Sequence, residues 1–264
     1  MFSLEFMKTF ESRITTLPRI GVLGGMGPLA SADFMAKLVY ATPVAHDQDH
    51  FPVSVDSTPQ IPDRVAALEG RGRDPLAHLV AAARRLQASG CDLIAMPCNT
   101  AHLWHARLAA QIALPLMHIV DAVDAQLGAV RKVGLLGTTA TLEHGLYQRH
   151  PGVERHWVLP DMDVMRDLVM PGIAAVKVGD TVAAARLLRS AARKLASNGA
   201  EAIVLACTEI PLVLTADDVP VRMVDATFAL ARHTIAAARS IGASAVARAA
   251  WNRATLPGHG IQVA

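Results

Sequence analysis

The chain of 264 residues carries two copies of one pattern. When Leu79–Cys98 is laid on Leu188–Cys207, a shift of 109 positions, eight of the twenty residues are identical without a gap. The identical pairs are Leu79/Leu188, Ala82/Ala191, Ala83/Ala192, Arg84/Arg193, Leu86/Leu195, Gly90/Gly199, Ile94/Ile203 and Cys98/Cys207. Alanine-rich stretches inflate such scores, but the paired glycines and the paired cysteines do not depend on alanine. The repeat predicts two related units of domain size.

Flanking segments extend the repeat. Gly21–Gly24 (GVLG) resembles Gly134–Gly137 (GLLG) at an offset of 113, and the strand leading to Asp121 resembles the one leading to Asp225 at an offset of 104. The two copies therefore differ by small insertions.

Short apolar runs alternate with longer Ala/Leu/Arg stretches of helical period, which is typical of parallel sheets covered by helices. We predict an α/β fold of two pseudo-twofold-related parallel-sheet subdomains, with the active site in the cleft between them. The clearest expected elements are a strand at Ile20–Gly24, a helix at Leu29–Tyr40 opened by Pro28, a helix at Pro75–Ser89 closed by Gly90, and a strand at Asp92–Met96.

Each copy places one cysteine, Cys98 or Cys207, at the carboxyl end of an equivalent strand. Ligands of open α/β sheets bind at this edge, so we expect the two thiols to face each other across a shared cleft. Helix N-termini there would lower each thiol pKa below the free value of ~8.5. Cysteine is also a common small core residue, and Cys91 is interpreted that way. Three cysteines cannot all pair within one chain, so reduced thiols are expected.

A glycine-rich turn, Gly24–Ala30, follows the first predicted strand. Its glycines let backbone amides approach an anion. It contains a weak dinucleotide fingerprint, and Asp47 and Asp49 lie at a suitable distance for a ribose contact. Pro28 removes one amide that such a phosphate site uses, which disfavours this alternative.

The loop Pro59–Arg64 is stiffened by two prolines, so Arg64 on it is a candidate clamp for a carboxylate. Lys177 is a second candidate cation, although a lysine near a helix C-terminus often only compensates the helix dipole. Hydroxyls of Thr138, Thr139 and Thr141 either line the same cleft or cap the next helix.

Cys98, His102 and His105 are spaced like a zinc-binding helix face. One helix seldom closes a metal site without a ligand from elsewhere, so no metal is expected. The other histidines, such as His46 and His50, are interpreted as polar loop residues.

Composition narrows the class of partner. With 52% apolar and 18% charged residues the chain is neither disordered nor a disulfide framework. A formal charge of +2 supplies no drive toward nucleic acid or a membrane surface. No apolar run reaches the ~20 residues of a membrane-spanning helix, and Met1–Pro18 lacks the apolar segment of a secretion signal. We expect a cytoplasmic chain with an N-terminal extension and a small-molecule partner.

Four linked motifs resemble the cofactor-independent aspartate/glutamate racemase family, and more closely its aspartate racemase branch. They are Gly21–Pro28 (GVLGGMGP), Pro59–Arg64 (PQIPDR), Met96–His102 (MPCNTAH) and Cys207–Leu212 (CTEIPL). Two positions depart from common family patterns. Glu209 stands where the glutamate racemases usually carry histidine, and Ala206 stands where glycine is common.

The resemblance implies racemisation of an acidic amino acid, aspartate before glutamate, by two cysteine bases without pyridoxal phosphate or another cofactor. It implies a homodimer and an inserted second subdomain: an extension at 1–18, a first subdomain at 19–116 plus 227–264, and a second at 117–226. Cys98 and Cys207 would be the bases. The expected substrate contacts are Met26, Gly27, Gln60, Arg64, Asn99, Thr100, Thr138, Lys177, Thr208 and Glu209.

Three alternatives stay open at this point. A relative that uses one cysteine covalently, such as maleate isomerase, or a hydantoin racemase, would share the fold. A non-catalytic amino-acid-binding regulator would also share it.

Overall fold

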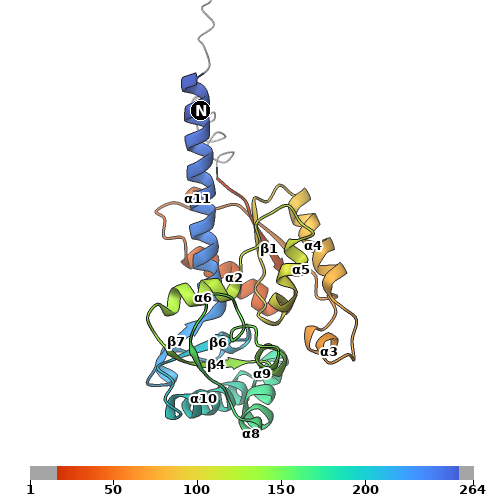
Figure 1. The fold of residues 1–264 in the computed structure, drawn as a ribbon, viewed down its shortest axis with the longest axis vertical. Coiled ribbons are helices and arrows are strands. Elements are labelled where there is room, and N and C mark those ends of the chain that lie inside the picture. The colour runs from red at the N-terminus through yellow and green to blue at the C-terminus, as the bar shows by residue number, and fades with distance from the viewer. Residues whose placement is uncertain (1–16, 256–264) are drawn as a thin grey trace, which may run out of the picture.

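The computed structural model describes residues 17–255, with side chains described as far as residue 244, so most of the predicted extension at 1–18 lies outside the described residues. Two separate parallel β-sheets organise the chain (Figure 1). The first has the strand order β2-β1-β3 and the second has the order β5-β4-β6-β7. The predicted α/β fold with two parallel sheets is confirmed.

The strands of the first sheet are β1 (Ile20–Gly24), β2 (Val53–Ser57) and β3 (Leu93–Ala95). Those of the second are β4 (Lys132–Gly137), β5 (His156–Val158), β6 (Ala202–Ala206) and β7 (Arg222–Asp225). Every residue of β1 and β6 is buried, as continuous apolar runs in a covered parallel sheet require. Strand β3 is shorter than predicted.

The sequence repeat is visible in the strand register. Gly21 pairs with Ile94 in the first sheet, and their counterparts Gly134 and Ile203 pair in the second. Leu116 forms an isolated parallel bridge to Ile94, in the place that β7 takes beside β6. Each half therefore contains the same arrangement of neighbouring strands.

The longer helices are α2 (Pro28–Tyr40), α4 (Leu76–Ala88), α6 (Ile119–Leu127), α9 (Met170–Lys177), α10 (Thr181–Ser197) and α11 (Ala226–Thr255). The short α-helices are α3 (Arg64–Leu68), α5 (His105–Ala109), α7 (Thr139–Glu143) and α8 (Met162–Val164). One π-helical turn, η3 (Met165–Val169), precedes α9, and 3₁₀ turns are η1 (Asp47–Asp49), η2 (Thr100–Trp104), η4 (Ile210–Leu212) and η5 (Ala216–Asp218). The predicted helix that begins at Pro28 is confirmed.

The identities in the repeat mark the buried faces of two equivalent helices. Leu79, Ala82, Ala83 and Leu86 are buried on α4, and their counterparts Leu188, Ala191, Ala192 and Leu195 are buried on α10. Their spacing of three and four residues places them on one helix face. Each of these faces packs on its own sheet.

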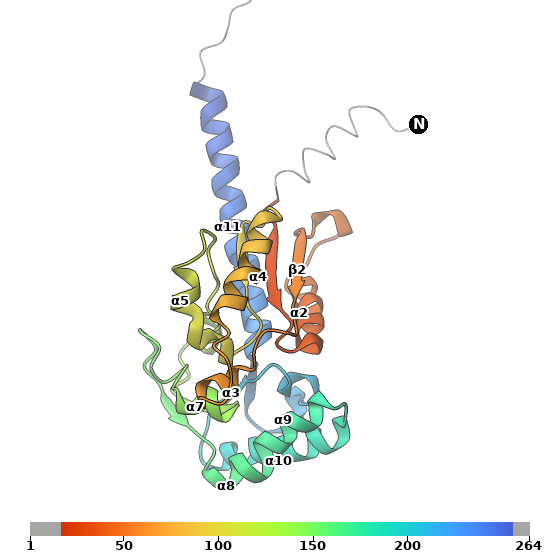
Figure 2. The same cartoon turned by 90° about the vertical axis from the view of Figure 1, so that its right-hand side faces the viewer.

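Helix α11 leaves the second sheet and packs against α6 and α2. It runs past α2 and projects beyond the rest of the described chain (Figures 1 and 2). The ammonium of Lys37 on α2 forms an ion pair with Asp225 at 2.7 Å and donates to the Thr227 hydroxyl at 2.8 Å. The end of the second sheet is thereby tied to a helix of the first half.

One apolar core joins the halves. It contains Val22 of β1 and Leu135 of β4 together with side chains of α6 and α11. Between residues 17 and 255, no helix combines the length and apolar character that a membrane crossing demands.

Candidate active site

Cys98 and Cys207 line a single cavity between the two halves of the chain. Cys98 lies three residues past the end of β3, and Cys207 directly follows β6. Both side chains are buried, at 6% exposure each. Two cysteines that are 109 positions apart, and that the repeat makes equivalent, thus share one internal space.

Most of the residues predicted as the site gather at this cavity. Its lining comprises Met26, Asp63, Arg64, Val65, Cys98, Asn99, Thr100, Thr138, Lys177, Cys207, Thr208 and Glu209. Gly27 instead lines the neighbouring outer pocket. Gln60 is exposed and lines neither space, because the side chains on either side of it, Pro59 and Ile61, are the ones that face the outer pocket.

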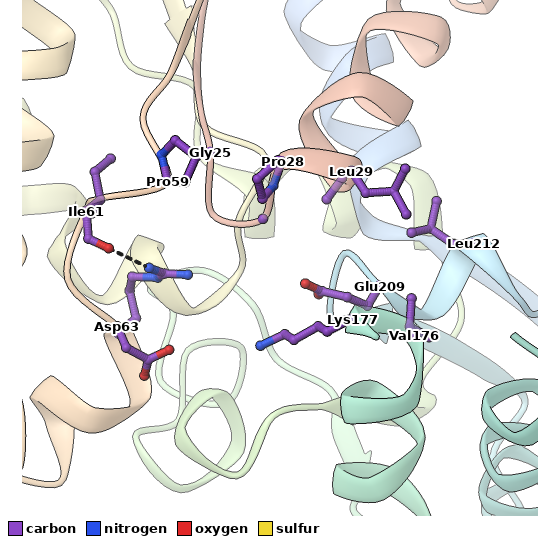
Figure 3. Close-up of a pocket in the computed structure, with 13 residues that line it drawn as sticks. Gly25, Pro28, Leu29, Pro59, Ile61, Asp63, Val176, Lys177, Glu209 and Leu212 are labelled. Carbon is purple, nitrogen blue, oxygen red and sulfur yellow. Dashed lines mark hydrogen bonds between the residues drawn. The ribbon is translucent and has the colours of Figure 1, made fainter. Parts of the chain in front are cut away.

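The outer pocket is the larger space, about 400 Å³ against about 30 Å³ for the cavity between the cysteines. The two spaces share Asp63, Arg64, Lys177 and Glu209. Figure 3 labels three of these, Asp63, Lys177 and Glu209, in the outer pocket. Small-molecule sites usually occupy about 300–1,000 Å³, so the inner cavity holds little more than a water molecule. The cavity as it stands is therefore smaller than an amino acid, and the shared side chains border both it and the outer pocket.

The turn after β1 is shaped by Gly25, which has a φ of +92°. A Cβ atom there would lie 2.5 Å from the backbone of Thr58, so no other residue fits. The Gly25 amide donates to the Ser31 hydroxyl at 2.8 Å. This amide is already used within the protein, which further weakens the dinucleotide alternative.

Arg64 begins α3, and its guanidinium donates to the carbonyls of Ile61 at 3.1 Å and Pro62 at 3.0 Å. Arg64 lines the same cavity as Cys98, and its charge lowers the pKa of that thiol. Lys177 is the last residue of α9, and its ammonium points into the outer pocket (Figure 3). Within the described range this ammonium forms no ion pair, so it is available to an anion.

The predicted fall in the thiol pKa values is wrong for both cysteines. Burial raises the pKa of Cys98, and the nearby Glu209 charge adds to the rise, while Arg64 and the Ala101 amide oppose it. Burial also raises the pKa of Cys207 well above the ordinary value, and here the Glu209 carboxylate adds its charge and a hydrogen bond. Each cysteine is followed by a short 3₁₀ turn, η2 or η4, whose dipole is too small to outweigh burial.

Glu209 lies against Cys207. Its Oε2 accepts hydrogen bonds from the Cys207 thiol at 3.0 Å and from the Thr208 hydroxyl at 2.9 Å. The carboxylate is buried and lines both the cavity and the outer pocket. It can therefore contact the protein's own thiol as well as a ligand.

Asn99 offers a free hydrogen-bond donor beside Cys98. Its Oδ1 accepts from the Tyr147 hydroxyl at 2.6 Å, and its buried Nδ2 has no partner among the described residues. A buried unpaired donor costs about 1–3 kcal/mol, which a ligand oxygen at this position would recover. Sequence analysis missed Tyr147, because a tyrosine 48 positions away carries no local signal of this contact.

Three threonine hydroxyls join the turn after β3 to the turn after β4. Thr100 Oγ1 lies 3.1 Å from Thr138 Oγ1 and 2.9 Å from Thr141 Oγ1, and the last two are 2.9 Å apart. Thr138 also caps α7, so it both lines the cavity and caps the helix. Thr139 faces a different pocket.

His102 and His105 turn their ring nitrogens to main-chain carbonyls, of Cys98 at 2.8 Å and Leu116 at 3.0 Å respectively. Burial, with the neighbouring His118, lowers the pKa of His102 to about 3. These rings are neutral packing groups near the site, and within the described residues they form no ligand set with the Cys98 sulfur.

The chain is similar to proteins of one family. The family model described as Asp/Glu/Hydantoin racemase matches residues 23–234. The broad specificity amino-acid racemase RacX of Bacillus subtilis (strain 168) is 27% identical over 229 residues, which are 82% of this chain and 96% of that protein.

Two solved structures share the architecture. The Picrophilus torridus aspartate racemase has a TM-score of 0.75 and 31% identity, over 84% of this chain and 94% of its own. An aspartate racemase homologue from Pyrococcus horikoshii OT3 has a TM-score of 0.64 and 26% identity, over 84% of this chain and 100% of its own.

Proposed function

The chain belongs to the Asp/Glu/hydantoin racemase family and is an amino-acid racemase, and we propose that it interconverts the enantiomers of an acidic amino acid, aspartate foremost. In this proposal Cys98 and Cys207 are the two bases. The supporting observation is that both thiols line one cavity, together with the unpaired amide of Asn99.

Racemisation needs a proton removed from one face of the Cα atom and another delivered to the opposite face. A thiolate at one cysteine takes the Cα proton and becomes a thiol, while the thiol of the other cysteine gives up its proton and becomes the thiolate. The thiol and the thiolate have then changed places, which is the state that the opposite enantiomer requires. The site therefore works in both directions without a further residue.

Burial raises the pKa of each thiol, so we expect both to be protonated near neutral pH in the substrate-free site. One proton must leave before catalysis. The cationic ammonium of an incoming amino acid, placed beside the sulfurs, favours the thiolate. The charge of Arg64 further favours the thiolate at Cys98, so we propose that Cys98 is the first thiol to ionise.

The negative charge that develops on the substrate carboxylate requires donors that are already in place. Asn99 Nδ2 is an unpaired donor at the cavity, and the Thr100 hydroxyl lies there too, whereas the Thr208 hydroxyl already donates its proton to Glu209. Exclusion of water by the small cavity strengthens each of these contacts.

The preference for an acidic side chain rests on Arg64 and Lys177, which border the outer pocket. A second carboxylate in this pocket would meet both cations. The similarity of this chain to an aspartate racemase, over most of both chains, supports aspartate as the substrate.

A broad substrate range is the second candidate. The outer pocket also has apolar walls, formed by Leu29, Ile61, Val176 and Leu212. These walls would accept an uncharged side chain, and the chain is also similar to a racemase of broad specificity.

Incubation with single enantiomers in heavy water tests the proposal. We expect L-aspartate to lose optical activity while solvent deuterium appears at Cα. Parallel arms with glutamate, alanine, hydantoins and maleate separate an acidic preference from a broad range and from the related reactions. Binding without deuterium exchange in every arm would indicate a regulator and overturn the proposal.

Cofactor independence and a homodimer are parts of the same proposal. Activity is expected to survive hydroxylamine, which captures pyridoxal phosphate, and sedimentation is expected to give twice the chain mass. Loss of activity with hydroxylamine would instead require an aldehyde cofactor.

A further inference from the structure

Four histidines form a continuous cluster beside the active-site turn. The ring centroids of His102 and His118 are 5.1 Å apart, those of His105 and His118 are 4.4 Å apart, and those of His118 and His150 are 4.4 Å apart. At its outer end, His150 Nε2 lies 2.6 Å from a carboxylate oxygen of Asp121. The racemase proposal uses none of the groups at this end.

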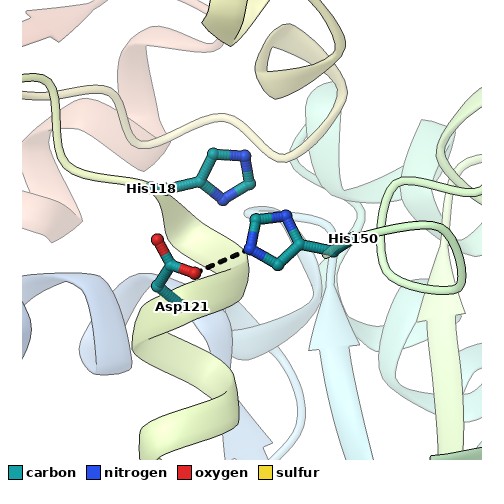
Figure 4. Close-up of side chains that lie close together, drawn as sticks. All are labelled: His118, Asp121 and His150. Atoms are coloured by element: carbon teal, nitrogen blue, oxygen red, sulfur yellow. Dashed lines mark hydrogen bonds and ion pairs between the residues drawn. The ribbon is translucent and has the colours of Figure 1, made fainter. Parts of the chain in front are cut away.

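His118, Asp121 and His150 each direct one donor atom toward a common region, and these atoms all lie within 4.8 Å of one another (Figure 4). His118 is the N-cap residue of α6, and Asp121 lies in its first turn. His150 comes from the turn that follows α7. Two segments that are distant in the sequence therefore supply the three groups.

We propose that His118, Asp121 and His150 bind a divalent transition metal ion of the Zn²⁺ class. Two imidazole nitrogens and one carboxylate oxygen are a donor set that zinc and its neighbours in the first transition row prefer, whereas Mg²⁺ and Ca²⁺ prefer oxygen donors. A tetrahedral ion of this class needs donors about 3.3 Å apart, given metal–ligand bonds of about 2.0–2.1 Å. The three atoms lie within 4.8 Å of one another, so binding requires a small adjustment, for which the half-exposed Asp121 side chain has room.

Within the described residues, two contacts compete with the ion for these donor atoms. The His150–Asp121 contact is replaced, since each group then bonds to the metal. The Val120 amide donates to His118 Nδ1 at 3.2 Å, which is long for such a hydrogen bond.

The bound ion would fasten α6 to the turn at His150. Tyr147, three residues before His150, holds the Asn99 amide by its hydroxyl. The metal ligand His150 is therefore three residues from Tyr147, which supports the active-site asparagine. None of the three proposed ligands lines the cysteine cavity.

Cobalt is the probe that distinguishes this site from the thiols. Titration of the purified, metal-free chain with Co²⁺ is expected to give visible ligand-field bands at one ion per chain, without the near-ultraviolet charge-transfer band of a cobalt–thiolate bond. The variants H150A and D121N are expected to weaken binding by at least about tenfold, because the loss of even an outer-shell partner of a ligand costs about 10–100-fold in affinity. Zn²⁺ is expected to raise the thermal midpoint of the parent chain and not of these variants.

H144A is the matched control, since His144 is an exposed histidine six residues earlier in the same segment. It is expected to bind Co²⁺ like the parent chain. Circular dichroism without metal verifies that each variant is folded. A charge-transfer band, an unchanged affinity in H150A and D121N, or no binding at micromolar Co²⁺ would each overturn the proposal.

Discussion

The Cys207 thiol donates a hydrogen bond to the Glu209 carboxylate across 3.0 Å, between residues two positions apart. Cys98, at the equivalent place in the other half, instead lies beside the guanidinium of Arg64. The two sulfurs thus have partners of opposite charge, and the acid–base behaviour of the site depends on this difference.

Replacing Glu209 by Gln is expected to lower the pKa of Cys207, because the negative charge and the accepted hydrogen bond that raise it are removed. In the parent enzyme, kcat/KM is expected to rise with pH beyond the ordinary thiol value of ~8.5. Glu209 also raises the pKa of Cys98, the thiol to which we assign the first ionisation, so the rising limb of kcat/KM against pH should move to lower pH in E209Q. The pH dependence of thiol alkylation, followed by mass spectrometry, checks the same shift independently of turnover.

The control is E143Q, which neutralises an exposed glutamate outside the cavity. Its pH profile should superpose on that of the parent. An unmoved or alkaline-shifted limb in E209Q would show that the Glu209 charge does not govern this ionisation.

Replacing Cys98 or Cys207 by Ala is expected to reduce racemisation by about 10²–10⁴-fold, the usual contribution of a general acid or base. Each variant retains one thiol and so can exchange the Cα proton of one enantiomer with solvent. Nuclear magnetic resonance in heavy water measures both rates. C91A serves as the comparison, because Cys91 is buried in the core of the first half and does not line the cavity. Interconversion at the parent rate in both single variants contradicts the two-base assignment.

Replacing Lys177 by Gln removes the ammonium that points into the outer pocket (Figure 3). A hydrogen bond to a charged group contributes about 1.5–3 kcal/mol, so KM for aspartate should rise by about tenfold or more. Turnover of alanine, which has no second carboxylate, should change little. K194Q changes an exposed lysine outside the pocket and should leave both substrates unaffected. An equal effect on the two substrates would assign Lys177 a structural role.

Replacing Tyr147 by Phe leaves Asn99 Oδ1 without its donor and frees the amide to rotate. We expect KM to rise and kcat/KM to fall by about tenfold, in line with a cost of about 1–3 kcal/mol for a buried group left unpaired. The chain offers a control in its other tyrosine, Tyr40, which is 77% exposed, so Y40F should behave like the parent. If Y147F lowers thermal stability alone and leaves kcat/KM unchanged, Tyr147 does not position the asparagine.

Replacing Gly25 by Ala should destabilise the chain more than replacing Gly90. Both glycines have positive φ, +92° and +78°, so both variants carry the backbone strain of about 1–2 kcal/mol. Only at Gly25 does the new Cβ meet the backbone of Thr58, whereas nothing lies within 4 Å at Gly90. Urea unfolding measures the difference, and equal losses would mean that the turn after β1 can relax.

The sequence predicts the first strand, Ile20–Gly24, to the residue, because a fully buried parallel strand appears as an uninterrupted apolar run. It also predicts that Cys98 and Cys207 border one cleft, because each cysteine follows an equivalent strand of the duplicated unit, and both line one cavity. Backbone periodicity is a local property, and a sequence shows it directly.

Contacts between side chains that are distant in the sequence are harder to predict from the sequence. The Tyr147–Asn99 bond and the hydroxyl contacts of Thr141 depend on how two turns from different halves dock. Gln60 illustrates the same limit, because a motif gives a position in the loop but not the side to which each residue turns. The direction of the cysteine pKa shifts depends on burial, which outweighs the short helices that follow.

The chain repeats its scaffold while placing unlike groups beside the two sulfurs. Mirror-image amino acids have equal free energies in water, so their equilibrium constant is unity and kcat/KM must be the same for both. Arg64 on one side and Glu209 on the other can therefore hold one enantiomer more tightly only if that enantiomer also turns over more slowly, in equal proportion. The unlike partners can therefore give the two enantiomers different KM and kcat values, but the ratio kcat/KM stays equal in the two directions.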